Sequence, residues 1–139
     1  MPTWQLQTPI QAVLFDCDGT LASIEGIDEL AKNNRVGGAV ETLTADAMGK
    51  SGINFDLYQK RLDLVRPTQE QVITLGQHYF SNQVPDAKDV IALLQRLNKS
   101  VYLISAGLFP AVSLFGKLLQ IPEENIFAVN IDFDTNGTF

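Results

Sequence analysis

Three short apolar runs along the chain predict strands. The first covers residues 12–15 and stops at Asp16, the second covers residues 101–104 and stops at Ser105, and the third covers residues 126–129. Continuous apolar runs of this length are typical of parallel strands that are buried on both faces, whereas a half-exposed strand alternates between apolar and polar residues. We therefore expect a parallel sheet whose first strand is covered on both sides.

Two helical patterns alternate with these runs. One begins after Pro85-Asp86 and the other ends before Pro122, and both have apolar residues at helical spacing. The apolar positions are Val90, Ile91, Leu94 and Leu97 in the first, and Val112, Phe115, Leu118 and Leu119 in the second. The order strand, helix, strand, helix, strand is typical of a Rossmann-like α/β fold with right-handed crossovers.

The interval 21–84 between the first two strands is too long for one crossover, and its pattern predicts four helices. Gly49 is expected to end the second in left-handed geometry, and Thr68–Gln71 has capping-box spacing for the fourth. The apolar faces are Ile27, Leu30 and Ala31; Val40, Leu43 and Ala47; Phe55, Tyr58, Leu62 and Val65; and Val72, Leu75 and Tyr79. We expect a helical cap at 21–84 on a core formed by 1–20 and 85–139. An ordinary helical half of an α+β domain is the alternative.

The last residues predict a hairpin that the chain does not complete. Residues 131–133 alternate as a strand, and Asn136-Gly137 is a strong hairpin-turn signal. The returning arm would contain Thr138 and Phe139 alone. We interpret this as a cut inside an element, so the sheet is expected to be incomplete, with about three strands and the start of a hairpin.

Composition narrows the class of protein. The 139 residues are 45% hydrophobic and 19% charged, which is typical of a globular domain, and no apolar run is long enough for a membrane span. The net charge of −6 argues against a general binder of nucleic acid or anionic membranes. The single cysteine, Cys17, excludes an internal disulfide and a cysteine-rich zinc site. We expect a soluble cytoplasmic protein.

The candidate chemistry lies where the first two strands end. Asp16 and Asp18 follow the first strand, and the ligand crevice of an open α/β sheet lies outside the carboxyl ends of its strands. Paired carboxylates suit Mg²⁺ and covalent phosphoryl transfer. A calcium loop that begins at Asp16 is excluded, because Ile27 would stand where the bidentate Glu belongs. An Asp-rich turn remains open. Ser105 could reach the same crevice or cap the following helix, and its position in the topology favours the crevice.

These segments resemble motifs of a known superfamily. Residues 16–20, Asp-Cys-Asp-Gly-Thr, resemble the first motif of the haloacid dehalogenase-like hydrolases, and residues 103–107 resemble the second. Within the helical interval, residues 25–31, 47–49 and 61–62 are similar to the cap of the phosphoserine phosphatase family. Together the matches span nearly the whole chain in order.

The resemblance implies a Mg²⁺-dependent hydrolase that converts O-phosphoserine to serine and phosphate in serine biosynthesis. Asp16 would attack the phosphoryl group to form an aspartyl-phosphate, and Asp18 would handle the protons. Mg²⁺ would be held by the Asp16 carboxylate and the Asp18 backbone carbonyl. From the cap, Glu25 would meet the substrate ammonium and Arg61 its carboxylate, which the planar guanidinium matches bidentately.

The second motif would hold phosphoryl oxygens through Ser105 and the amide of Ala106. The family has Ser-Gly-Gly there, and Ala106 replaces the first glycine, so its methyl group could crowd that amide.

The family's third motif, a lysine, and its fourth, a Gly-Asp pair with a later Asp, would lie beyond residue 139. We therefore expect a truncated, nearly inactive chain with an exposed sheet edge, through which copies could pair into a homo-oligomer. The alternatives are a phosphatase for another small phosphomonoester, and a non-catalytic binding or assembly module derived from the family.

Overall fold

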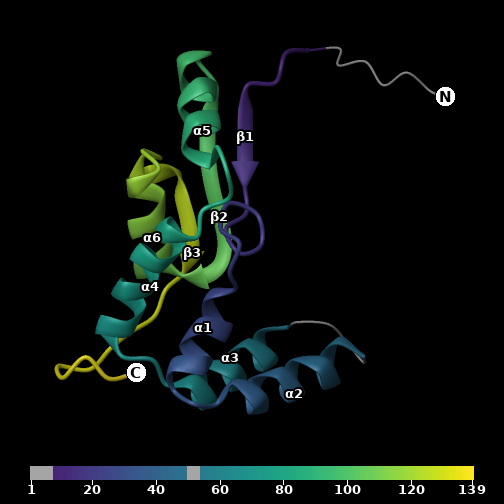
Figure 1. Ribbon diagram of the computed structural model, residues 1–139, viewed down its shortest axis with the longest axis vertical. Helices are drawn as coiled ribbons and strands as arrows, with labels where there is room; N and C mark the ends of the chain where they lie inside the picture. The colour runs from purple at the N-terminus through teal and green to yellow at the C-terminus, as the bar shows by residue number, and fades with distance from the viewer. Residues whose placement is uncertain (1–7, 50–53) are drawn as a thin grey trace.

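The computed structural model of the protein describes residues 8–49 and 54–139 (Figure 1). In chain order the elements are β1 (Ala12–Phe15), α1 (Gly26–Asn33), α2 (Gly37–Met48), α3 (Phe55–Val65), α4 (Gln69–Ser81), α5 (Ala87–Arg96), β2 (Ser100–Leu108), α6 (Phe109–Leu118), a 3-10 turn at Glu123–Asn125, and β3 (Ile126–Val129).

The three strands form one parallel sheet in the order β1-β2-β3. Val13 pairs with Val101, and Leu103 pairs with Ile126. The connections β1 to β2 and β2 to β3 both carry helices, as parallel pairing requires. The predicted α/β class, its three parallel strands and the helices between the first two are therefore confirmed, and Figure 1 shows α1, α2 and α3 gathered beyond one end of the sheet.

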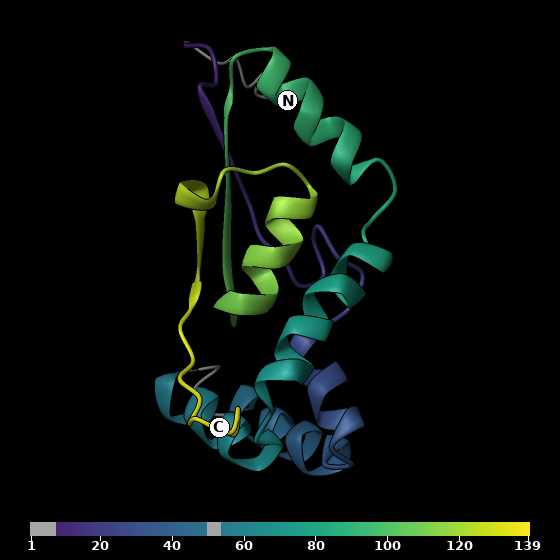
Figure 2. The ribbon, with the colours of Figure 1, turned by 90° about the vertical axis from the view of Figure 1, so that its left-hand side faces the viewer.

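The two faces of the sheet differ sharply in burial. Val101, Leu103 and Ile126 are buried beneath α5 and α6, which lie on one side of the sheet in Figure 2. On the other face Leu14 is 61% exposed, although the apolar run predicted a strand covered on both sides. That expectation was wrong, because no helix within residues 8–49 and 54–139 covers this face.

Strand β2 is longer than its apolar run predicted, because pairing with β3 resumes at Leu108 and Val129 after an irregularity that begins at Ile104. Ser105 therefore lies inside β2 and not after its end. The side chain still reaches the carboxyl end of β1, since β2 extends past β1 at this point.

The four predicted helices between β1 and β2 all form. The capping box of α4 is present: the Thr68 side chain accepts from the Gln71 backbone, and the Gln71 side chain accepts from the Thr68 backbone. Gly49 has φ −73°, so the expected left-handed end of α2 was wrong. Instead Arg66 adopts the left-handed conformation at the end of α3, at φ 44°. The division into a cap at 21–84 and a core stays a prediction.

The buried core runs from the sheet into the helices, and α4 connects the two. Tyr79 of α4 is fully buried, and its ring lies 5.6 Å from the ring of Phe115 in α6. Not every apolar position that shared a predicted helical face is buried: Phe55, Val90 and Leu97 are exposed. None of the helices in the described ranges combines the length and apolar composition needed to cross a membrane.

The expected hairpin at the end of the chain does not form. Residues 131–133 join no strand ladder, although the turn itself is present, with Gly137 at φ 73° and the Asp134 carboxylate accepting from the backbone of Asn136 and Thr138. Thr138 bridges instead to Thr68, next to the start of α4. A two-residue arm makes too few ladder hydrogen bonds to hold residues 131–133 in a strand.

Candidate active site

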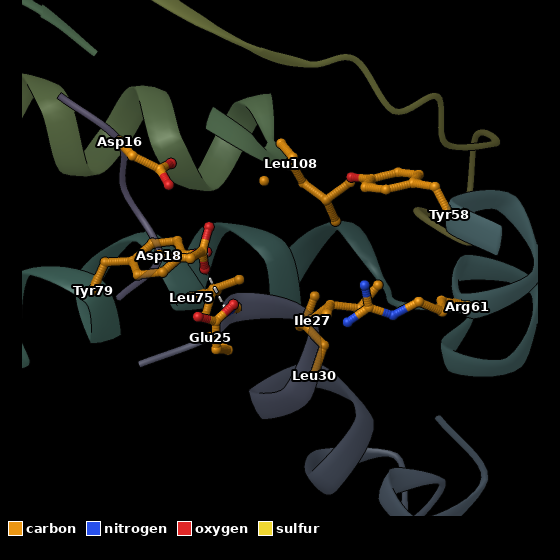
Figure 3. A pocket seen from close by; sticks show the side chains of 13 residues that line it. Asp16, Asp18, Glu25, Ile27, Leu30, Tyr58, Arg61, Leu75, Tyr79 and Leu108 are labelled. Atoms are coloured by element: carbon orange, nitrogen blue, oxygen red, sulfur yellow. Dashed lines mark hydrogen bonds between the residues drawn. The ribbon is translucent and has the colours of Figure 1, made fainter. Parts of the chain in front are cut away.

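A cavity of about 240 Å³ lies between the carboxyl end of the sheet and helices α1, α3 and α4 (Figure 3). The two Asp residues come from the loop after β1, Glu25 directly precedes α1, and Arg61 lies in α3. The lining residues are Asp16, Asp18, Glu25, Gly26, Ile27, Leu30, Tyr58, Arg61, Leu75, Tyr79, Ala106, Gly107 and Leu108. Four of the charged residues singled out from the sequence thus face one small space.

The Asp18 carboxylate is held from both sides of the cavity. Its Oδ1 atom accepts hydrogen bonds from the Gly26 backbone amide at 2.6 Å and from the Tyr79 hydroxyl at 2.7 Å. Its Oδ2 atom accepts from the Ser105 hydroxyl at 3.3 Å. Three donors together fix the orientation of this carboxylate.

The Asp16 carboxylate is more open. Its Oδ1 atom accepts from the adjacent Cys17 amide at 2.7 Å, and Figure 3 shows the carboxylate pointing into the cavity. The side chain is exposed. An accessible carboxylate oxygen beside a second, firmly positioned carboxylate is the arrangement needed for a nucleophile and a proton carrier.

The second-motif residues occupy different places. Ala106 lines the cavity, whereas Ser105 lies behind Asp18 and is not among the lining residues. The Ser105 hydroxyl also accepts from the Gly107 amide at 2.9 Å. An added Cβ on Gly107 would lie 3.0 Å from Val112 and 3.1 Å from the Ser105 hydroxyl, so the backbone approaches its neighbours closely here.

Glu25 precedes the first turn of α1 in extended geometry and faces the two Asp residues. Burial raises the pKa of its carboxyl above the ordinary value, and the charges of Asp18, Asp28 and Asp16 raise it further. The Arg61 guanidinium opposes these effects. The cavity therefore has an excess of carboxylates at one end.

Arg61 supplies positive charge at the other end. The residue lies on α3 and is 9% exposed, and Figure 3 shows its guanidinium directed into the cavity. The nearest acidic group is Asp28, whose Oδ1 lies 3.7 Å from Nη2. The Nε atom is buried and has no hydrogen-bond partner among the described residues. Because a buried unpaired donor is costly, this geometry favours an anionic ligand.

Sequence reasoning missed two tyrosines of the site and the role of Gly26, whose amide donates to Asp18. Tyr79 and Tyr58 were expected only as apolar helix positions, yet both line the cavity. Burial raises the pKa of Tyr58 to about 12, although Arg61 acts in the opposite direction. Burial also raises the pKa of Tyr79 strongly, so its hydroxyl remains a donor to Asp18. No local pattern signals these contacts, since Tyr79 and Asp18 are 61 positions apart.

The donor set fits a small, hard cation only in part. Within the part of the chain that the structure describes, no three His, Cys, Asp or Glu side chains are grouped as a metal site. The open Asp16 carboxylate provides one oxygen. Mg²⁺ is commonly bound by one or two carboxylates together with substrate phosphate and water, so this carboxylate supplies part of such a site.

Cys17 should be inert in the folded protein. Its side chain is 0% exposed, and burial raises the pKa of the thiol. We expect alkylation of Cys17 by iodoacetamide at pH 8 to be about a thousandfold slower in buffer than in concentrated urea. In buffer the thiol reacts only in the small fraction of molecules in which local or global unfolding exposes it. The rate can be followed by mass spectrometry. Equal rates in both solvents would contradict the burial of this loop.

Comparisons with known proteins agree on one group of enzymes. No protein-family model matches the chain. A Bos taurus phosphoserine phosphatase is 38% identical over 128 residues, which are 92% of this chain and 57% of the relative. An Arabidopsis thaliana protein named chloroplastic phosphoserine phosphatase is 37% identical over 130 residues, which are 94% of this chain and 44% of the relative. The chain thus spans about half the length of these relatives.

Solved structures lead to the same group. A phosphoserine phosphatase described as a phospho-aspartyl intermediate analogue has a TM-score of 0.77 at 27% identity, over 95% of this chain and 61% of that one. A substrate-bound phosphoserine phosphatase has a TM-score of 0.77 at 26% identity, over 96% of this chain and 61% of that one. Along almost its whole length, this chain is therefore related to part of the phosphoserine phosphatases and has their haloacid dehalogenase-like fold.

Proposed function

We propose that the protein binds O-phosphoserine and belongs to an enzyme that hydrolyses it to serine and phosphate. The observation that carries this proposal is a cavity with Asp16 and Asp18 at one end and the buried Arg61 Nε, which has no partner among the described residues, at the other. The carboxylate of a phosphorylated amino acid would match the Arg61 end, and its phosphorus would lie beside the open Asp16 carboxylate at the other end. The related phosphoserine phosphatases support the same substrate.

In the first step an Asp16 carboxylate oxygen attacks phosphorus, and the bond between phosphorus and the serine oxygen breaks. Asp18, in its protonated form, gives its proton to the departing serine oxygen. The products of this step are an aspartyl-phosphate and serine. Asp18 is well positioned for this role, since three hydrogen bonds orient its carboxylate.

In the second step a water molecule attacks the aspartyl-phosphate. Asp18, now ionised, accepts a proton from this water, and the bond between phosphorus and the Asp16 oxygen breaks. Phosphate is released, Asp16 returns to its carboxylate form, and Asp18 regains its proton. The same residue thus serves as acid and then as base, as microscopic reversibility allows.

The remaining groups would bind and orient the substrate. Arg61 pairs with the carboxylate of phosphoserine, and Glu25 accepts hydrogen bonds from its ammonium group. The amide of Ala106 and the Ser105 hydroxyl are assigned to phosphoryl oxygens. Because Ser105 contacts Asp18 in this structure, its hydroxyl would turn from that carboxylate toward the phosphate.

Mg²⁺ is the cofactor that we propose, held by the Asp16 carboxylate and the Asp18 carbonyl. When bound, it would offset the repulsion between the anionic phosphate and the carboxylates. We further propose that α1–α4 act as the cap of the site. The single buried Cys17 suits a reducing compartment such as the cytoplasm, where the enzyme would act in serine biosynthesis.

The substrate assignment can be tested by comparing the affinity of the chain for O-phosphoserine with its affinity for ligands that each lack one charged group. Isothermal titration calorimetry with Mg²⁺ should give an affinity for O-phosphoserine at least about tenfold higher than for O-phosphoethanolamine, which lacks the carboxylate, or 3-phosphooxypropionate, which lacks the ammonium. Equal affinity for all three would favour a phosphatase for another small phosphomonoester. No binding of any of them would favour a non-catalytic module.

Phosphate release tests the contribution of the chain to turnover. If the lysine and Gly-Asp motifs of the family are needed, release from O-phosphoserine by the 139-residue chain should be at least about 10⁴-fold slower than by the Bos taurus relative. Comparable rates would contradict the need for further groups.

A further inference from the structure

Helix α3 places a second polar side chain at the Arg61 end of the cavity. Tyr58 and Arg61 are three positions apart on α3, so they share one face of the helix, and both line the cavity. Figure 3 shows both side chains extending from α3 toward the end of the cavity that holds Asp16 and Asp18, with the phenol oxygen of Tyr58 leading. A ligand group that Arg61 binds therefore lies in a space that Tyr58 also borders.

The Tyr58 hydroxyl is a hydrogen-bond donor that the fold does not use. It has no hydrogen-bond partner among the described residues, whereas the hydroxyl of Tyr79, the other tyrosine of the cavity, donates to Asp18. The Tyr58 ring is half-buried and packs against the hydrophobic core, which holds it in place. Because a tyrosine in such a position normally finds a polar partner for its hydroxyl, the geometry favours an acceptor supplied by a ligand.

The acceptor must lie near Arg61. Burial raises the pKa of Tyr58 to about 12, so the hydroxyl is protonated at neutral pH and can donate. The charge of Arg61 affects this pKa more than the charge of Asp18 does, which places the phenol nearer to Arg61. A carboxylate has lone pairs enough to accept from a guanidinium and from a hydroxyl at the same time.

We propose that the Tyr58 hydroxyl donates a hydrogen bond to the substrate carboxylate that Arg61 binds, and so makes the site selective for a free phosphorylated amino acid. This inference rests on the proposed function and adds a specificity-determining residue to it. A carboxamide, as in a phosphorylated peptide, carries no charge for Arg61 and would form a weaker, neutral hydrogen bond with Tyr58. Three apolar lining residues, Ile27, Leu30 and Leu108, lower the local dielectric and thereby strengthen a charged hydrogen bond here.

Removal of the phenol oxygen alone tests this role. Tyr58→Phe retains the ring and should lower the affinity of the chain for O-phosphoserine about tenfold in calorimetry with Mg²⁺, because a hydrogen bond to a charged group is lost. The affinity for O-phosphoethanolamine, which lacks the carboxylate, should change less than about twofold. Tyr102→Phe is the matched control, since Tyr102 lies in β2 and is not among the lining residues, and it should leave both affinities unchanged.

A double variant tests whether Tyr58 and Arg61 bind the same group. In Tyr58→Phe, Arg61→Met, the loss of affinity for O-phosphoserine should be smaller than the sum of the losses in free energy of the two single variants. Strict additivity would show that the two side chains bind separate groups, which would overturn the proposal. Thermal unfolding of each variant shows that it is folded.

The remaining outcomes separate this inference from the proposed function. If the unsubstituted chain does not bind O-phosphoserine, or binds both ligands equally, the proposed function fails and this inference fails with it. If that chain prefers O-phosphoserine and Tyr58→Phe keeps the full preference, the role of Tyr58 is overturned while the proposed function stands. An equal loss for both ligands would assign the hydroxyl to the phosphate or to the shape of the cavity, and would also overturn its role at the carboxylate.

Discussion

Replacing Arg61 by Met should weaken O-phosphoserine binding about 100-fold, or about 3 kcal/mol, as measured by calorimetry. The guanidinium is buried, directed into the cavity and unpaired at Nε, so its partner is expected to be the substrate carboxylate. Met retains much of the aliphatic volume while it removes every donor. The loss should therefore report on charge and hydrogen bonding more than on packing.

Two controls isolate this contact. Lys60→Met removes an exposed cation from the adjacent position of α3 and should change the affinity less than about twofold. O-Phosphoethanolamine lacks the carboxylate, so Arg61→Met should lower the affinity for this ligand far less than the affinity for O-phosphoserine. An equal loss of affinity for both ligands would show that Arg61 maintains the shape of the cavity and does not bind the substrate carboxylate.

Replacing Gly26 by Ala should destabilise the protein by about 2 kcal/mol, as measured by urea unfolding. A Cβ at this position would overlap the Tyr79 hydroxyl and lie 2.8 Å from the Tyr79 ring carbon that carries it. Ala is a better helix former than Gly by about 1 kcal/mol, so the packing conflict must exceed this gain. The Gly26 amide also donates to Asp18, so the same conflict disturbs the orientation of that carboxylate.

A matched glycine and a double variant test this explanation. Gly38 lies near the start of α2, and a Cβ there would meet nothing within 4 Å, so Gly38→Ala should be neutral or stabilise the protein by up to about 1 kcal/mol. In the double variant Gly26→Ala, Tyr79→Leu, the total loss should be smaller than the sum of the two single losses. Strict additivity would mean that the two side chains do not conflict.

The element order was predictable because local signals and tertiary packing agree. Thr68 and Gln71 form the capping box that their spacing predicts, and Val101 and Leu103 lie in a buried strand. The predictions failed where the burial of a residue depends on segments far away in the sequence. The apolar run at 12–15 predicted burial on both faces, but Leu14 is exposed because the second layer is absent from the described residues.

The site was predictable to a similar extent. Asp16 and Asp18 stand out locally, because two carboxylates after an apolar strand point to the crevice of an α/β sheet. Glu25 and Arg61 were assigned through the family resemblance, and both line the cavity. Their roles, and those of Ser105 and Ala106, stay predictions. Tyr79 could not be found this way, since an apolar helix position gives no indication that its hydroxyl contacts Asp18.

The sequence by itself determined the alternation of strands and helices, the net negative charge, and the position of two candidate catalytic carboxylates in the loop after β1. These depend on hydrophobic periodicity, composition and short motifs, which are properties of neighbouring residues. Only the tertiary structure decided that Gly26, Tyr79 and Ser105 hold one carboxylate, that Arg61 is buried at the other end of the same cavity, and that one face of the sheet is open. Such contacts join residues far apart in the chain, so their geometry follows from packing and not from any local pattern.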